Sequence, residues 1–109
     1  MKIDISARHF QLGGALKDHI EGKVDRLEKY SLKIEKAHVI LEVQKFRQMA
    51  EIELSGKNLR LTAKSQDSDM YKAFDECFGK IQLQIQRKHD KVRDHKARRY
   101  TAKTSSKEE

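Results

Sequence analysis

The 109-residue sequence contains no proline, a single cysteine and no long apolar run. Without proline there is no stiff linker between separate folding units, and a chain of this length fits one compact domain. Cys77 has no partner for an internal disulfide, which agrees with a reducing compartment. The longest apolar run, residues 39–41, is far shorter than the roughly 20 residues that cross a bilayer. Because the first residues also show no signal pattern, we expect a cytoplasmic protein without a membrane partner.

Motifs for catalysis, metal binding and nucleotide binding are missing as well. His89 and His95 are six residues apart, which is too wide for a pair of zinc ligands. Cys77 falls within an apolar helical stripe, so we interpret it as a core residue. The chain has no glycine-rich phosphate loop, and Glu51 and Glu53 on one strand face are typical of the wet side of a sheet. We therefore expect no enzymatic activity, no cofactor, no metal and no small-molecule substrate.

The formal net charge of +7 is concentrated near the C-terminus. Residues 1–86 hold 15 lysines and arginines against 13 acids, whereas residues 87–103 hold eight basic side chains against only Asp90 and Asp94. Such a cluster attracts polyanions, because each phosphate that it neutralises releases a condensed counterion. Nucleic acid is therefore the favoured partner, although a basic helix end that serves only solubility gives the same pattern.

Alternation of apolar and polar residues predicts four strands. Residues 2–8 alternate in this way, and the period of two returns from Ala37. In that second segment one face carries Val39, Leu41 and Val43, and the other carries His38, Ile40, Glu42 and Gln44. Residues 50–54 and 59–63 alternate on either side of the turn-forming residues 55–58, which predicts a hairpin.

Two segments show the three- and four-residue spacing of amphipathic helices. The first runs from about residue 15 to residue 30, after the break at Gly13 and Gly14, with the stripe Leu16, Ile20, Val24 and Leu27. The second follows polar caps in residues 65–69 and is expected to reach the middle nineties, with the stripe Met70, Phe74, Cys77, Phe78, Ile81, Ile85 and Val92.

These elements predict an α+β domain in the order strand, helix, three strands, helix. Because each helix has one apolar stripe and the sheet has one apolar face, the economical packing places both helices on one face of a four-stranded sheet. We expect the domain to comprise residues 1–98. Residues 99–109 lack apolar periodicity and are expected to form a disordered tail.

Both predicted helices carry basic residues beside the apolar stripe, when side chains are placed at about 100° per residue. On the first helix this flank comprises Lys23, Arg26, Tyr30 and Lys33. On the second it comprises Lys80, Gln84, Arg87 and Lys91, with Lys88 at the boundary and with Arg93, Lys96, Arg98 and Arg99 beyond. Packed side by side, the two flanks would form one cationic surface for phosphate contacts, with Tyr30 available to stack or hydrogen-bond. Ordinary surface lysine remains the alternative for any single residue.

Nothing in the sequence indicates recognition of particular bases. The aromatic signature of RNA-recognition sheets is missing. The exposed sheet face offers instead His38, Glu42, Glu51, Glu53 and Thr62. We therefore expect binding by phosphate geometry and shape, which suits folded RNA because side chains cannot read the deep major groove of an A-form helix.

Five segments and the basic helix after them carry a family resemblance. They are I-D-I-S-A-R at residues 3–8, L-E-K-Y at 27–30, H-V-I-L-E-V at 38–43, A-E at 50–51 and D-M-Y-K-A-F-D at 69–75. With these segments the chain resembles the short ribosome hibernation promoting factors, also known as ribosome-associated inhibitors and formerly as sigma-54 modulation proteins. The resemblance covers about residues 1–96, and D-M-Y-x-A-x-D with the upstream L-E-K-Y is its most specific part.

The resemblance implies a fold similar to double-stranded RNA-binding domains, docked on small-subunit rRNA in the decoding region, where it overlaps the mRNA channel and the tRNA sites. Such proteins inhibit translation and promote ribosome hibernation in starved, stressed or stationary-phase bacteria, and some short forms promote ribosome dimers. The family's rRNA contacts are largely basic helix side chains. The resemblance places them at Lys23, Arg26, Lys80, Arg87, Lys88 and Lys91, with Arg8 as a further candidate.

Two other functions fit the same residues. A protein-interaction module would bind its partner through the open sheet face or a free strand edge. A general double-stranded RNA binder would show no preference for the ribosome. Steep loss of binding with added salt separates RNA binding from an apolar protein interface, and competition with plain duplex RNA separates the two RNA-binding functions.

Overall fold

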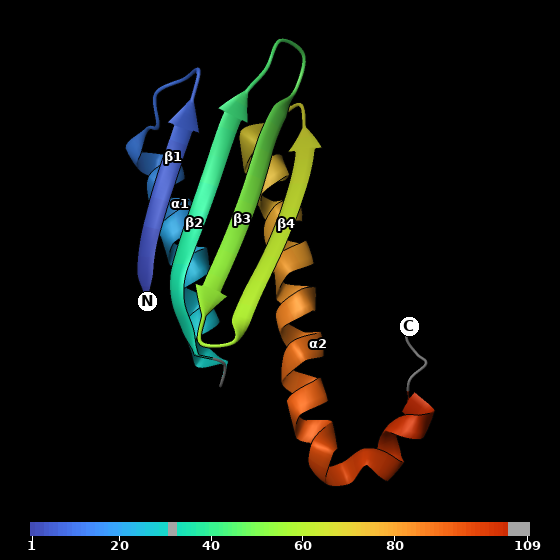
Figure 1. Ribbon diagram of the computed structural model, residues 1–109. Coiled ribbons are helices and arrows are strands. Elements are labelled where there is room, and N and C mark those ends of the chain that lie inside the picture. Colours follow the sequence, from blue (N-terminus) through green and yellow to red (C-terminus); the bar gives the residue numbers. More distant parts are fainter. Residues whose placement is uncertain (31–32, 105–109) are drawn as a thin grey trace.

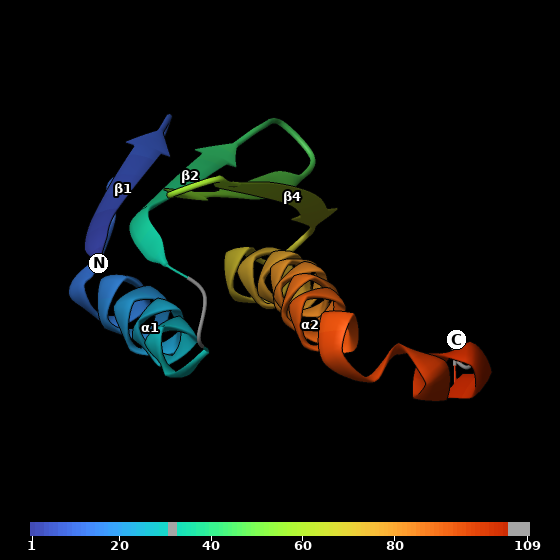
Figure 2. The ribbon, with the colours of Figure 1, turned by 60° about the horizontal axis from the view of Figure 1, so that its bottom comes forward.

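The computed structural model describes residues 1–30 and 33–104, with side chains described as far as residue 88. The elements follow in the order β1 (Lys2–Arg8), α1 (Gly14–Asp25), η1 (Arg26–Lys29), β2 (Ile34–Val43), β3 (Gln48–Gly56), β4 (Leu59–Asp67) and α2 (Met70–Thr104). The strands form one sheet in the order β1-β2-β3-β4, in which β1 is parallel to β2 and the other pairs are antiparallel. Figure 1 and Figure 2 show both helices on one face of this sheet. The predicted α+β fold is confirmed.

The hydrophobic core lies between the two helices and the inner face of the sheet. The first helical stripe is buried as predicted, and so are the inward residues of the two central strands: Leu16, Ile20, Val24, Leu27, Val39, Leu41, Ile52 and Leu54. On α2, Phe74, Ile81 and Ile85 have no exposed surface. Burying a side chain of this size contributes about 1.5–3 kcal/mol to the free energy of folding. The periodic apolar residues therefore supply the main stabilisation of the domain.

α1 is short and ends in a tighter turn. It begins after Gly13, which offers no side chain to cap the first backbone N–H groups. From Arg26 onward the last part of the predicted helix is the 3-10 turn η1, which still buries Leu27. The position of α1 therefore depends on the burial of its apolar stripe and not on capping.

The start of α2 differs from the sequence prediction. Residues 65–67, which we expected among the helix caps, continue β4 instead, and Ser65 is buried there. Among the described contacts, the only side chain that caps the helix is that of Asp69. Its Oδ1 accepts a hydrogen bond from the backbone N–H of Tyr71 at 3.2 Å. Residues 65–67 belong to β4 because they pair with residues 48–50 of β3, and this pairing satisfies their backbone groups in the sheet.

α2 extends beyond the sheet to Thr104 (Figure 1). It passes the middle nineties, where the apolar stripe ends, so that residues 99–104 of the predicted disordered tail are helical. Residues 80–104 contain neither glycine nor proline, and nothing in the backbone stops the helix. The rest of the predicted tail, residues 105–109, lies outside the described residues, and the division into domain and tail stays a prediction. Among the described residues, no helix combines the length and the apolar character needed to cross a membrane.

The turn between β3 and β4 depends on two residues. Asn58 has a φ of 56°, in the left-handed region that asparagine tolerates better than most residues. Gly56 lies directly against the carbonyl group of Lys33, so that a Cβ at this position would overlap the Lys33 oxygen. The end of the hairpin thus packs against the chain that enters β2, where Ile34 pairs with Gly56.

Candidate nucleic-acid interface

One side of α2 faces the edge strand β4, and we define the side chains Lys80, Gln84 and Arg87 as its β4 flank. Their three- and four-residue spacing places them on one face of the helix. Lys80 Nζ donates a hydrogen bond to the carbonyl oxygen of Lys64 at 3.0 Å, and Gln84 Nε2 donates one to that of Thr62 at 2.8 Å. These bonds tie α2 to β4 and cover carbonyl groups that a sheet edge otherwise presents to solvent.

The positive charge of the β4 flank is not compensated within the described part of the chain. No described carboxylate forms an ion pair with Lys80, with Arg87 or with the neighbouring Lys88. Arg87 is exposed, Lys88 is half-buried, and Lys80 uses one of its three N–H donors on β4. The β4 flank can therefore contact phosphate groups. Lys91 and the basic residues beyond it have side chains outside the described residues.

Lys23 of α1 faces α2 and is paired there with an acid. Its Nζ lies 3.3 Å from Oδ1 of Asp75 and 5.6 Å from the ring centroid of Phe78. His19 Nε2 lies 2.8 Å from the same Asp75 oxygen. Partial burial raises the pKa of Asp75, but the hydrogen bonds and charges of His19 and Lys23 outweigh it and hold that pKa below its ordinary value. Lys23 therefore links the two helices, and its charge is compensated in doing so.

The other predicted residues near the end of α1 differ in exposure. Arg26 is exposed in η1, and Lys33 is exposed in the segment before β2. Tyr30 is half-buried and packs against the core, with Lys29 Nζ 5.8 Å from its ring centroid. Only part of the Tyr30 ring is therefore accessible for the stacking that we expected.

The structure does not bring Lys23 and Lys80, one from each predicted basic flank, onto one surface. Lys23 faces the side of α2 that holds Asp75, whereas Lys80 lies against β4 on another side of α2. The reason is geometric, because five residues along a helix correspond to a rotation of about 140°. Arg8 lies elsewhere again, at the end of the opposite edge strand, where it lines a pocket with Glu42 and Lys64 on the open sheet face. Lys23, Lys80 and Arg8 thus occupy three separate places.

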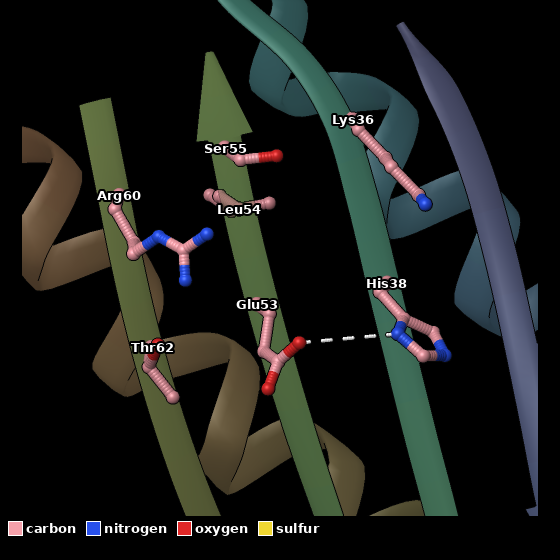
Figure 3. A pocket seen from close by; sticks show the side chains of 7 residues that line it. All are labelled: Lys36, His38, Glu53, Leu54, Ser55, Arg60 and Thr62. Atoms are coloured by element: carbon pink, nitrogen blue, oxygen red, sulfur yellow. Dashed lines mark ion pairs between the residues drawn. The ribbon is translucent and has the colours of Figure 1, made fainter. Parts of the chain in front are cut away.

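The open face of the sheet carries charges of both signs, some of them paired. His38 Nε2 lies 2.9 Å from Ser6 Oγ, and His38 Nδ1 lies 3.9 Å from Glu53 Oε1. Lys36 Nζ lies 3.4 Å from Asp4 Oδ2. Figure 3 shows Glu53 turned toward His38, in a shallow pocket of about 170 Å³ lined by Lys36, His38, Glu53, Leu54, Ser55, Arg60 and Thr62. Because acids and bases alternate on this face, it suits a phosphate backbone less well than the β4 flank does.

The sequence prediction covered this face only in part. The polar residues that we expected there do belong to it, as the strand register shows: His38, Glu42, Glu51, Glu53 and Thr62. Arg60 and Lys64, which alternate with the apolar residues of the last predicted strand, lie on the same face, and Lys36 also lies there but was not anticipated. Asp75, the partner of Lys23, was also missed as a site residue.

Chemistry other than binding finds no support in the described residues. Among them, no three histidine, cysteine, aspartate or glutamate side chains approach one another as metal ligands would. Cys77 is buried, and its Sγ donates a hydrogen bond to the carbonyl oxygen of Ala63 at 3.3 Å. Burial raises the pKa of the Cys77 thiol to about 12, so the thiolate nucleophile does not form near neutral pH. Cys77 is a core residue, as predicted.

The fold and the uncompensated β4 flank define a small α+β binding domain with one long, basic helix. The sequence model of the family described as sigma 54 modulation protein / S30EA ribosomal protein matches residues 3–93. The chain belongs to this family, which confirms the predicted resemblance. The family consists of binding proteins without enzymatic activity, in agreement with the missing catalytic motifs.

Curated relatives and solved structures are similar over most of the chain. A ribosome hibernation promoting factor of Azotobacter vinelandii is 32% identical over 85 residues, which is 78% of this chain and 79% of the relative. One of Klebsiella oxytoca is 26% identical over 95 residues, 87% of this chain and 100% of the relative. The N-terminal domain of Thermus thermophilus Protein Y has a TM-score of 0.72 at 27% identity, covering 80% of this chain and 98% of that one. A ribosomal subunit interface protein of Coxiella burnetii, with a TM-score of 0.70 at 21% identity over 80% of this chain and 96% of that one, shares the fold.

Proposed function

We propose that this chain binds the small ribosomal subunit through rRNA in the mRNA and tRNA region, and that it holds ribosomes inactive during starvation or stress. Family membership and the names of the relatives support ribosome binding and hibernation. The observation that carries the RNA contact is the charge of Lys80 and Arg87 in the β4 flank, which forms no ion pair with a described carboxylate. Ribosome binding also implies that the protein acts in the cytoplasm.

The β4 flank suits a rigid contact with folded RNA. Lys80 and Gln84 are fixed to β4 by hydrogen bonds, so α2 approaches its partner in a defined orientation. Arg87 lies one turn further along the helix and is exposed, and its planar guanidinium can contact a phosphate through two parallel hydrogen bonds. Because no part of this contact reads a base edge, recognition depends on phosphate positions and groove shape.

The remaining predicted cations take lesser parts in this proposal. Arg26 and Lys33 are exposed and extend the contact on the α1 side. Lys23 contributes only if rRNA displaces or shares its ion pair with Asp75. Arg8, on the opposite face of the sheet, reaches RNA only if the domain is enclosed on both faces, as a domain wedged into a channel would be.

Sedimentation with separated ribosomal subunits tests this proposal. We expect the protein to migrate with the small subunit and not with the large one, and to dissociate steeply as salt rises. A duplex RNA that competes as well as the small subunit would leave only general double-stranded RNA binding. Binding that resists salt would point to a protein interface. Sedimentation of whole ribosomes with and without the protein reports whether it promotes ribosome dimers.

A further inference from the structure

The connection between β2 and β3 exposes an aromatic side chain that the fold does not use. Phe46 lies in this loop with 85% of its surface exposed, more than the exposed fraction of Tyr71 or Leu83. Single apolar residues on a surface are ordinary, but this ring is flanked by cations and lies in a closed loop. Phe46 contributes little to the core and is well placed to contact another molecule.

The loop that carries Phe46 is held in place at both ends. The backbone N–H of Gln44 donates a hydrogen bond to the carbonyl oxygen of Arg47 at 2.8 Å, which closes the loop. The Arg47 guanidinium donates a second one to Gln66 Oε1 on β4 at 2.9 Å. A loop fixed in this way loses little conformational entropy on binding, because its shape exists beforehand.

Cations flank the aromatic ring on both sides in the sequence. Lys45 Nζ lies 5.6 Å from the ring centroid of Phe46, and Arg47 follows directly. No described carboxylate forms an ion pair with Lys45 or Arg47. An exposed ring between two uncompensated cations matches a nucleotide, whose base stacks on the ring while its phosphate contacts the cations. A purely apolar protein patch would not complement this charge.

We propose that Phe46, Lys45 and Arg47 form a binding site for an unpaired base of single-stranded RNA. The site is distinct from the β4 flank, because the β2–β3 loop lies at one end of the sheet and α2 leaves the sheet at the other (Figure 1). It therefore contacts a second RNA segment, and it does not depend on the small-subunit proposal. Stacking tolerates any base, so the site selects unpaired RNA without reading its sequence.

The test uses Phe46→Trp, which introduces the only tryptophan of the chain. Short oligoadenylate is added at raised salt, where phosphate contacts weaken and stacking persists. We expect quenching of the tryptophan by the single strand and not by duplex RNA or by polyphosphate, which has no bases. Tyr71→Trp, at a partly exposed position of α2 against His19 and outside the β4 flank, is the matched control and should not respond. Equal quenching by polyphosphate, or none by oligoadenylate, would overturn the proposal.

Affinity measurements by competition separate aromatic stacking from non-specific hydrophobic contact. Phe46→Ala and Phe46→Leu should both bind oligoadenylate about tenfold more weakly than the unchanged protein, whereas Phe46→Tyr should keep the affinity. All these variants should keep the thermal midpoint, because the side chain is exposed. If Phe46→Leu binds as well as the unchanged protein, the ring does not stack. Binding of the same variants to the small subunit is measured separately by sedimentation. Failure of oligoadenylate binding alone contradicts the Phe46 site, and failure of small-subunit binding by the unchanged protein contradicts the proposed function.

Discussion

His19 on α1 and Asp75 on α2 lie with Nε2 and Oδ1 2.8 Å apart, in a contact that joins the two helices of the domain. Lys23 shares the same oxygen, and the His19 ring packs edge-on against Tyr71 and Phe74 with centroids 5.1 Å and 5.8 Å away. One carboxylate thus joins α1 to α2, in addition to the buried apolar stripes of the two helices. It also accounts for the position of Lys23, which faces an acid and not the solvent.

Asp75→Asn should lower the free energy of unfolding by about 0.5–1 kcal/mol near neutral pH, since the contact is partly exposed and screened by solvent. The pKa of Asp75 is held below its ordinary value of 3.8 in the folded protein, so its contribution is present above that pH and is lost as pH falls through the folded pKa. Chemical denaturation at neutral and at acid pH measures both effects. The unchanged protein should lose more stability in acid than the variant, and equal losses would contradict this role of Asp75.

Substitution of Gly56 tests the packing of the hairpin against Lys33, and substitution of Gly79 is its control. Gly56→Ala should destabilise the protein by about 1–3 kcal/mol, because its Cβ would overlap the Lys33 carbonyl oxygen and the backbone must move. Gly79 lies within α2, where an added Cβ would meet no heavy atom of a neighbouring element within 4 Å, so Gly79→Ala should stabilise by about 0.5–1 kcal/mol. Thermal unfolding of the two variants tests this prediction. If both variants shift the melting temperature in the same direction, the close approach at Gly56 is contradicted.

Phe74→Ala should cost about 3–5 kcal/mol of stability, because the ring is fully buried beneath the sheet. Leu83→Ala on the same helix removes an apolar side chain that is 47% exposed, and it should change stability by about 0.5 kcal/mol or less. Urea denaturation of both variants checks the orientation of α2. Comparable losses would mean that the apolar face of α2 is not the one against the sheet.

Cys77 should resist alkylation until the domain unfolds. Burial raises its pKa to about 12 from an ordinary value of 9.0, so the folded protein presents neither a thiolate nor an accessible sulfur. Iodoacetamide labelling followed by mass spectrometry should be slow in buffer and fast in denaturant. Because the unfolded thiol ionises first, stability should also decline as pH rises above 9.0. Equal labelling of the folded and the unfolded chain would show that Cys77 is exposed.

The sequence predicts the fold well because each element has its own period. In β2 the buried Val39 and Leu41 alternate with half-buried His38 and Glu42, and in α2 the stripe through Phe74 and Ile81 is continuous. Burial of these apolar residues is enough to fix the register of the strand and the inward face of the helix. The boundary at Ser65 was missed because a short polar segment is compatible with both a strand end and a helix cap.

The arrangement of the basic residues could not be predicted in the same way. A helical wheel places Lys80 beside the apolar stripe, but it does not show which neighbour covers that side. The answer depends on the strand order, which puts β4 next to Lys80 and leaves Asp75 facing α1. Exposure of Phe46 likewise follows from the closed loop between β2 and β3, and no periodic signal marks it.

Co-sedimentation of a charge-reversed protein with small ribosomal subunits tests the central claim most directly. Arg87→Glu combined with Lys91→Glu should weaken binding by about tenfold or more at low salt, because phosphate contacts dominate the affinity. Lys2→Glu combined with Lys17→Glu makes the same change in charge at exposed positions on β1 and α1, outside α2, and it should bind almost as the unchanged protein does. Full retention of binding by the first pair, with its thermal midpoint intact, would contradict an rRNA contact through α2.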